Sequence, residues 1–147
     1  MFNKKFFISW IFSALAMFGI SYVWHGLVMF DLKIISTRIP LPLYLAFAAV
    51  AYLVIGAVVS RVYSMEYFKT FTRQVFLRGL IAGAVCGFLI FIISLVTGVS
   101  FAKNSTSAFI FVDMTWQIIE QAIGGFVVGI VHAFVWDDSM MRSQDID

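Results

Sequence analysis

The chain has 147 residues, of which 62% are hydrophobic and 12% charged, and its net charge is +2. Soluble domains are about 45–50% apolar and about 25% charged, so this composition excludes an ordinary soluble protein and places the chain in a lipid bilayer. The small net charge gives no indication of a nucleic-acid partner. The single cysteine excludes an intramolecular disulfide and a cysteine metal cluster.

Four stretches are apolar and long enough to cross a bilayer, which takes about 20 residues. They cover residues 6–30, 43–63, 79–101 and 109–136. Because these stretches occupy most of the chain, they leave no room for a soluble domain. The sequence therefore predicts one all-α membrane domain over residues 1–147, with four transmembrane helices in an antiparallel bundle.

The first stretch begins like a signal peptide, with Lys4, Lys5 and a short apolar run that reaches Ala14-Leu15-Ala16. The apolar run continues without a charge to Phe30, however, which is far longer than a signal-peptide core. We therefore predict that this stretch is retained as the first membrane span.

The basic residues indicate how the chain is oriented in the membrane. Seven of the ten lie at the N-terminus, after the second stretch or in the C-terminal tail: Lys4, Lys5, Arg61, Lys69, Arg73, Arg78 and Arg142. By the positive-inside rule these segments are cytoplasmic, so we expect both termini in the cytoplasm of a bacterial cell and the spans in its inner membrane. The polar, acidic tail at 137–147 is predicted to be disordered.

The loop at 64–78 has an amphipathic pattern. Phe68, Phe71 and Val75 repeat at helical spacing, whereas Lys69 and Arg73 point elsewhere. This pattern favours a short helix that lies in the cytoplasmic interface, with its basic groups near anionic headgroups. A docking surface for a soluble partner is the alternative.

Small residues are spaced for close helix packing in the third and fourth stretches. The ridge residues are Gly79, Gly83 and Gly87 in the third stretch and Gly124, Gly125 and Gly129 in the fourth. Such ridges let two helix backbones approach closely in a membrane. The loop between these stretches is short, which favours a helical hairpin, but the sequence leaves open whether the glycine faces meet within one chain or across a homodimer.

The fourth stretch carries most of the polar groups inside the membrane. At 100° per residue, Asp113, Gln117 and Glu120 share a narrow sector of one helix face, and Gln121 and His132 flank it. A charged side chain at the bilayer centre costs about 2.5–3.5 kcal/mol on insertion scales, so this face should meet protein, water or a partner.

His25 lies near the end of the first stretch, at the depth predicted for the segment from Asp113 to Glu120. If the first and fourth helices adjoin, His25 could bond Glu120, and an outward-opening polar pocket would form. We expect Tyr22, Trp24 and Trp116 at its rim. The alternatives are an interfacial histidine and a neutral Glu120 that is hydrogen-bonded to Gln117 or Gln121. The candidate site residues are His25, Asp113, Trp116, Gln117, Glu120, Gln121 and His132.

No cofactor or metal is expected. His25 and His132 lie roughly 20 Å or more apart along the membrane normal, at a rise of ~1.5 Å per residue, so they cannot ligate one haem. The ligand types at His25, Asp113 and Glu120 suit a metal, but no HExxH-like spacing supports one.

The segment FGISYVWHG at 18–26, followed by three more spans, resembles small bacterial membrane proteins of unknown function that have an aromatic-glycine motif at this place. The resemblance covers about ten residues, and the rest is similar in hydropathy alone. It implies a four-helix fold and no particular activity. His25 departs from the motif, because an aromatic residue is expected at that position.

The sequence favours a small membrane protein that works by helix association, as an accessory subunit or scaffold bound to other membrane subunits or to a second copy of itself. The alternative is a small proton-linked carrier that uses Glu120 and His25, because intramembrane carboxylates mark ion paths. An enzyme acting on lipids or quinones ranks last, since no clustered catalytic set is present. A carrier requires water access toward Glu120, whereas a scaffold requires that face to be packed dry.

Overall fold

The computed structural model describes residues 4–28, 40–97 and 107–135, and the tail predicted to be disordered lies outside them. All secondary structure in these ranges is helical. The elements are α1 (Lys4–Val23) with a π-helical continuation η1 (Trp24–Val28), α3 (Leu41–Tyr63), α4 (Glu66–Phe71), α5 (Val75–Val96) and α6 (Ser107–Phe134).

Four helical segments are long and apolar enough to cross a membrane, as predicted: Lys4–Leu27, Leu41–Tyr63, Val75–Val96 and Ile110–Phe134. The third segment begins at Val75 rather than at residue 79. Val75, Phe76 and Leu77 form its first turn, so Arg78 belongs to the helix and not to the preceding loop.

The boundaries of α3 follow from its terminal residues. Pro40 is its N-cap, and a proline stands in its first turn, where a helix does not need the missing N–H. The Leu43 and Tyr44 amides donate to the Pro40 carbonyl at 3.0 and 3.1 Å. Beyond the last turn, the Ser64 hydroxyl donates to the Ser60 carbonyl at 2.9 Å, which satisfies a carbonyl near the helix end.

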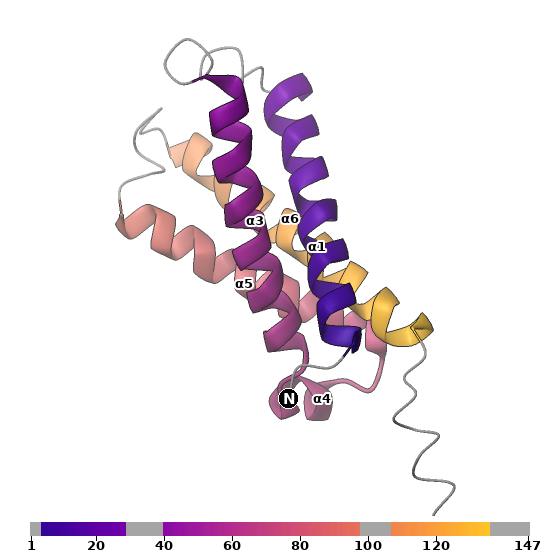
Figure 1. Ribbon diagram of the computed structural model, residues 1–147. Helices are drawn as coiled ribbons and strands as arrows, with labels where there is room; N and C mark the ends of the chain where they lie inside the picture. Colours follow the sequence, from indigo (N-terminus) through magenta and orange to yellow (C-terminus); the bar gives the residue numbers. More distant parts are fainter. Residues whose placement is uncertain (1–3, 29–39, 98–106, 136–147) are drawn as a thin grey trace, which may run out of the picture.

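The helices form two pairs (Figure 1). Helices α1 and α3 lie side by side, and the α5–α6 pair crosses behind them at an oblique angle. Helix α6 also packs along α1, so the first and fourth spans adjoin as the sequence interpretation required. The short helix α4 lies at the end of the molecule where α3 ends and α5 begins; we call this the α4 end, and we call the opposite end the η1 end.

The glycine ridges meet within one chain, which answers the question that the sequence left open. A Cβ atom at Gly79 would overlap the Gly125 carbonyl, and a Cβ at Gly83 would overlap the Gln121 carbonyl. Gly129 faces the Val75 carbonyl, which a Cβ would meet at 2.9 Å. The backbones of α5 and α6 are therefore in direct contact, and larger side chains at these positions would separate them.

Gly124 faces a different helix from its neighbour Gly125. A Cβ atom at Gly124 would overlap the Met17 side chain of α1 and would lie 3.1 Å from the Ser13 hydroxyl. The Ser13 hydroxyl donates to the Gly124 carbonyl at 2.9 Å. Ser9, one turn earlier in α1, donates to the Ser60 hydroxyl of α3 at 3.4 Å. Buried serines thus join α1 to both α6 and α3, in the manner of polar contacts between membrane helices.

The apolar core lies toward the α4 end. It contains Val59, Tyr63, Phe68, Ala82, Cys86 and Val128. Cys86 is buried there as a small packing residue. Phe71, which the amphipathic pattern placed with Phe68, is the last residue of α4 and is exposed, and the helical register is interrupted after it, so that Val75 belongs to α5. At that point Thr72 adopts an extended backbone, with φ −147° and ψ 132°.

The close contact predicts that Gly83→Ala destabilises the protein. The new methyl group would overlap the Gln121 carbonyl and force α5 from α6, at an expected cost of about 1–3 kcal/mol. Unfolding in mixed detergent measures this free energy. Gly19→Ala is the matched control, because nothing lies within 4 Å of a Cβ there. Equal stability of the two variants would contradict the packing described.

Candidate functional site

Two polar side chains lie buried in the middle of α6. Glu120 is 1% exposed and Gln121 is 0% exposed. Because consecutive helical residues point about 100° apart, the two side chains enter different parts of the interior. Glu120 points toward α1 and α3. Asp113, Trp116 and Gln117 of the predicted stripe are only partly buried.

Polar groups of α3 and α6 lie around the Glu120 carboxyl. The Tyr52 hydroxyl of α3 and the Trp116 indole N–H interact with it, and Asp113 adds a nearby carboxylate. Among the described residues, however, neither Glu120 oxygen has a partner in hydrogen-bonding geometry. The Trp116 N–H and the Gln121 side-chain amide are also buried without a partner. Buried polar groups are usually satisfied by protein or water, so these side chains together form the candidate polar site.

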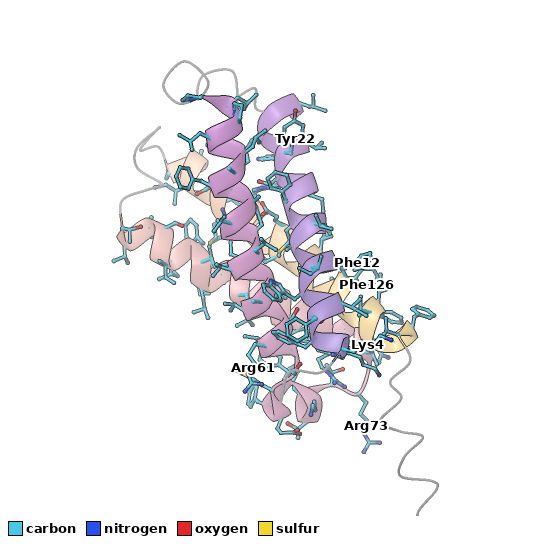
Figure 2. The ribbon with its side chains drawn as sticks, in the orientation of Figure 1. Lys4, Phe12, Tyr22, Arg61, Arg73 and Phe126 are labelled. Carbon is cyan, nitrogen blue, oxygen red and sulfur yellow. The ribbon has the colours of Figure 1, made fainter. Side chains whose placement is uncertain are left out.

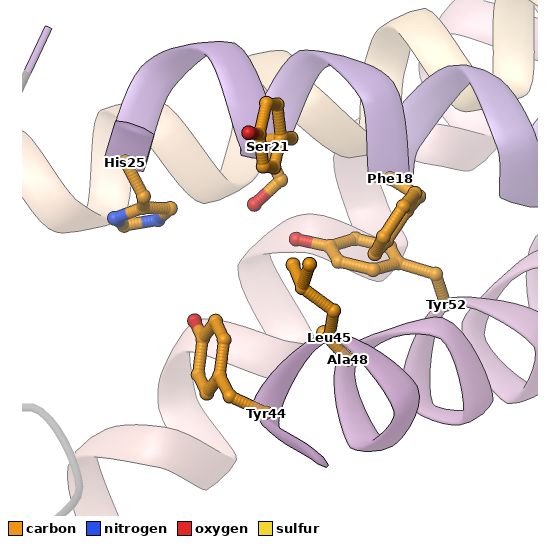
Figure 3. Close-up of a pocket in the computed structure, with 8 residues that line it drawn as sticks. Phe18, Ser21, His25, Tyr44, Leu45, Ala48 and Tyr52 are labelled. Carbon is orange, nitrogen blue, oxygen red and sulfur yellow. The ribbon is translucent and has the colours of Figure 1, made fainter. Parts of the chain in front are cut away.

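A cavity of about 110 Å³ lies between α1 and α3 near the η1 end. In Figure 3, Ser21 and His25 reach into it from the α1 side, and Tyr44 and Tyr52 reach into it from α3. Phe18, Tyr22, Leu45 and Ala48 complete the lining. The space is large enough for several water molecules, which hydroxyl and imidazole groups can hold by hydrogen bonds.

Tyr52 connects this cavity with Glu120. Its hydroxyl interacts with Ser21 on the cavity side and with the Glu120 carboxyl on the α6 side. Its ring is held by Phe18, with the ring centroids 6.0 Å apart at an interplanar angle of 70°. The structure therefore brings His25 and Glu120 to the same region, with Tyr52 and Ser21 between them.

The three aromatic residues predicted at the rim of the pocket lie in two separate places. Tyr22 lines the cavity beside His25. Trp24 and Trp116 stack on each other instead, with centroids 4.1 Å apart and planes 9° apart. Together with Gly19, Ile20 and Val23, these tryptophans line a separate apolar groove between α1 and α6. Trp24 and His25 are the first two residues of the π-helical turn η1, and consecutive helical residues point in different directions about the axis, so the two rings meet different neighbours.

His132 does not join Glu120, although the sequence stripe extends to it. The two residues are 12 positions apart on α6, which is roughly 18 Å along the helix. His132 packs on Tyr63 with ring centroids 4.5 Å apart. Its Nδ1 lies 3.0 Å from the Val128 carbonyl, to which it donates a hydrogen bond.

Three residues of the site escaped the sequence interpretation: Ser21, Tyr44 and Tyr52. The second span contains few polar groups, and the sequence analysis placed no candidate site residue in it. Tyr44 and Tyr52 are nevertheless eight residues apart, a spacing that places both on one helix face. Ser21 likewise shares a face with Ser13, eight residues before it. A search for weakly polar side chains at helical spacing would have found both pairs.

Hydroxyl, imidazole and carboxyl groups arranged in this way can pass protons between water and a buried acid. Within the ranges that the structure describes, no three His, Cys, Asp or Glu residues are grouped in a way that could hold a metal ion.

Comparisons with models of protein families, with curated proteins and with solved structures find no match to this chain.

Because His25 lines the cavity, we predict that water reaches position 25. In His25→Cys, a charged thiol reagent added from the η1 side should label the new cysteine at least about tenfold faster than it labels the native Cys86, because thiol reactivity requires access and a thiolate. Mass spectrometry of the labelled protein measures both rates. Equal rates at the two positions would show that the cavity is closed to water.

Proposed function

We propose that the protein is a small proton-linked carrier in which Glu120 binds and releases the transported proton. The observation that carries the proposal is the placement of Glu120. Its carboxyl is almost completely buried and interacts with the Tyr52 hydroxyl and the Trp116 indole N–H, and Tyr52 also lines the cavity. His25, at the other side of the same cavity, is the companion group.

A buried carboxyl suits this role for an energetic reason. Holding an acid in the interior of a membrane protein is expensive, so carboxyls at such depth are kept in proton relays and ion paths. The hydroxyls of Ser21 and Tyr52 can relay a proton between water in the cavity and Glu120, because each both donates and accepts a hydrogen bond.

The charge distribution supports an orientation for the carrier. Lys4, Arg61 and Arg73 gather at the α4 end, whereas Tyr22 lies at the η1 end (Figure 2). By the positive-inside rule the α4 end is cytoplasmic, and the cavity opens toward the opposite face. In this arrangement both termini are cytoplasmic, the four spans cross as an antiparallel bundle, and the bilayer is the inner membrane of a bacterium.

The interpretation as an accessory subunit stays a prediction. The glycine ridges that suggested helix association are occupied by the α5–α6 contact within the chain, which leaves them unavailable to a partner. Native mass spectrometry of protein extracted gently from its membrane distinguishes the two functions. A stable complex with other chains would favour the subunit, whereas a monomer or homodimer would favour the carrier.

Proton flux into liposomes tests the role of Glu120. In Glu120→Gln the side chain keeps its size but cannot exchange a proton, so we expect flux to fall about tenfold or more. Glu66→Gln is the matched control, because the same chemical change then occurs at an exposed residue of α4. A pH-sensitive dye trapped in the liposomes reports the flux, and circular dichroism confirms that each variant is folded.

Two outcomes would contradict the proposal. If Glu120→Gln and Glu66→Gln conduct protons as the wild-type protein does, Glu120 has no part in transport. If Glu120→Gln fails to assemble in the membrane, the residue is needed for structure, and its assignment as the proton-binding group is withdrawn.

A further inference from the structure

We infer that the α4 end contains a binding site for a phosphate-bearing anion, formed by Lys5, Tyr63, Arg78 and His132. Each of these residues comes from a different membrane-spanning helix: Lys5 from α1, Tyr63 from α3, Arg78 from α5 and His132 from α6. The site lies at the opposite end of the bundle from the Glu120 cavity and does not depend on the proposed carrier function.

Arg78 is directed into the bundle. Its guanidinium carbon lies 5.3 Å from the centroid of the Tyr63 ring, in a cation–π contact. Tyr63 is 2% exposed, and Nε of Arg78 is buried without a hydrogen-bond partner among the described residues. An arginine that served only to anchor the helix would extend toward the headgroups and water. Here the guanidinium stays against the protein, which is the arrangement of a binding residue.

His132 presents its second ring nitrogen to the same region. Because Nδ1 donates to the Val128 carbonyl, Nε2 is the atom left to meet a ligand. The ring packs on Tyr63, and both Lys5 and Arg78 act on it electrostatically. The Arg78 guanidinium, the His132 imidazole and the Tyr63 phenol therefore meet at one place, and the Lys5 ammonium is near enough to act on His132 through its charge.

The charges at this place are not balanced within the described part of the chain. None of the described residues forms an ion pair with Lys5 or Arg78. The described acidic residue of α4, Glu66, is bound instead to Lys69 at 2.5 Å. Partly buried cations of like sign repel each other, so an anion that binds between them is stabilised by both.

The geometry of the donors favours a phosphate group. A guanidinium offers a planar fork of N–H donors that matches two phosphate oxygens, and an ammonium adds a point charge with three donors. The Tyr63 hydroxyl adds another hydrogen-bond donor. Two sources supply this chemistry at a cytoplasmic membrane surface: the headgroup of an anionic phospholipid and free phosphate.

Lipid retention tests the site on the full-length protein. The protein is reconstituted in mixed phosphatidylglycerol and phosphatidylcholine, extracted, and analysed by native mass spectrometry for bound lipid. We expect Arg78→Gln and Lys5→Gln to retain about tenfold less phosphatidylglycerol than the wild-type protein, because each loses charge-assisted hydrogen bonds. Arg73→Gln and Lys4→Gln are matched controls, since each removes one charge from an exposed neighbour outside the site.

A second measurement distinguishes the two sources of phosphate. If selective lipid loss occurs in the two site variants, the ligand is a lipid headgroup. If lipid retention is unchanged but inorganic phosphate raises the Tm of the wild-type protein and not that of Lys5→Gln, the ligand is soluble. Should Arg78→Gln fail to fold, Arg78→Lys replaces it, and weaker binding is expected because the planar fork is absent.

The inference is overturned by either of two results. Equal lipid loss in the site variants and in their controls would show that the basic surface acts only through its overall charge. If neither phosphatidylglycerol nor phosphate binds the wild-type protein, the cluster is not a binding site.

Discussion

The direct backbone contact between α5 and α6 is the constraint on which the rest of the structure depends. Because Gly79, Gly83 and Gly125 have no side chains, the two helices approach until backbone meets backbone. This contact fixes the rotation of α6 about its own axis. Once the rotation is fixed, Gly124 must face α1, and Glu120, one turn before it, must face α1 and α3. The position of the buried acid is thus a consequence of where the glycines lie.

The sequence predicts which segments form membrane-spanning helices better than it predicts how each helix is rotated about its axis. The four spans follow from apolar stretches of sufficient length, and the glycine spacing indicates a close contact between two of them. Helix rotation cannot be obtained in this way, because spans that are apolar all round have no strong preference for one face. For that reason Tyr44 and Tyr52 escaped notice in α3, and Trp116 was expected at the rim of the pocket rather than stacked outside it.

The polar groups of the interior fall into two sets with an apolar core between them. Near the η1 end, hydroxyl groups and His25 surround a cavity, and Tyr52 in its wall interacts with Glu120. Near the α4 end, Arg78 and His132 pack against Tyr63. Val59, Ala82 and Val128, each 0% exposed, occupy the space between. In the carrier that we propose, a proton entering from the cavity would meet this apolar core beyond Glu120, and complete transport would require the helices to rearrange there.

The π-helical turn η1 begins with the consecutive residues Trp24 and His25, whose rings meet different neighbours. Trp24 stacks on Trp116, whose indole N–H approaches Glu120, and His25 lines the cavity between α1 and α3. Winding this turn back to an ordinary α-helix would swing both rings about the helix axis in the same sense and at the same time. The stacking of Trp24 on Trp116 and the place of His25 in the cavity wall are therefore linked through a single peptide segment.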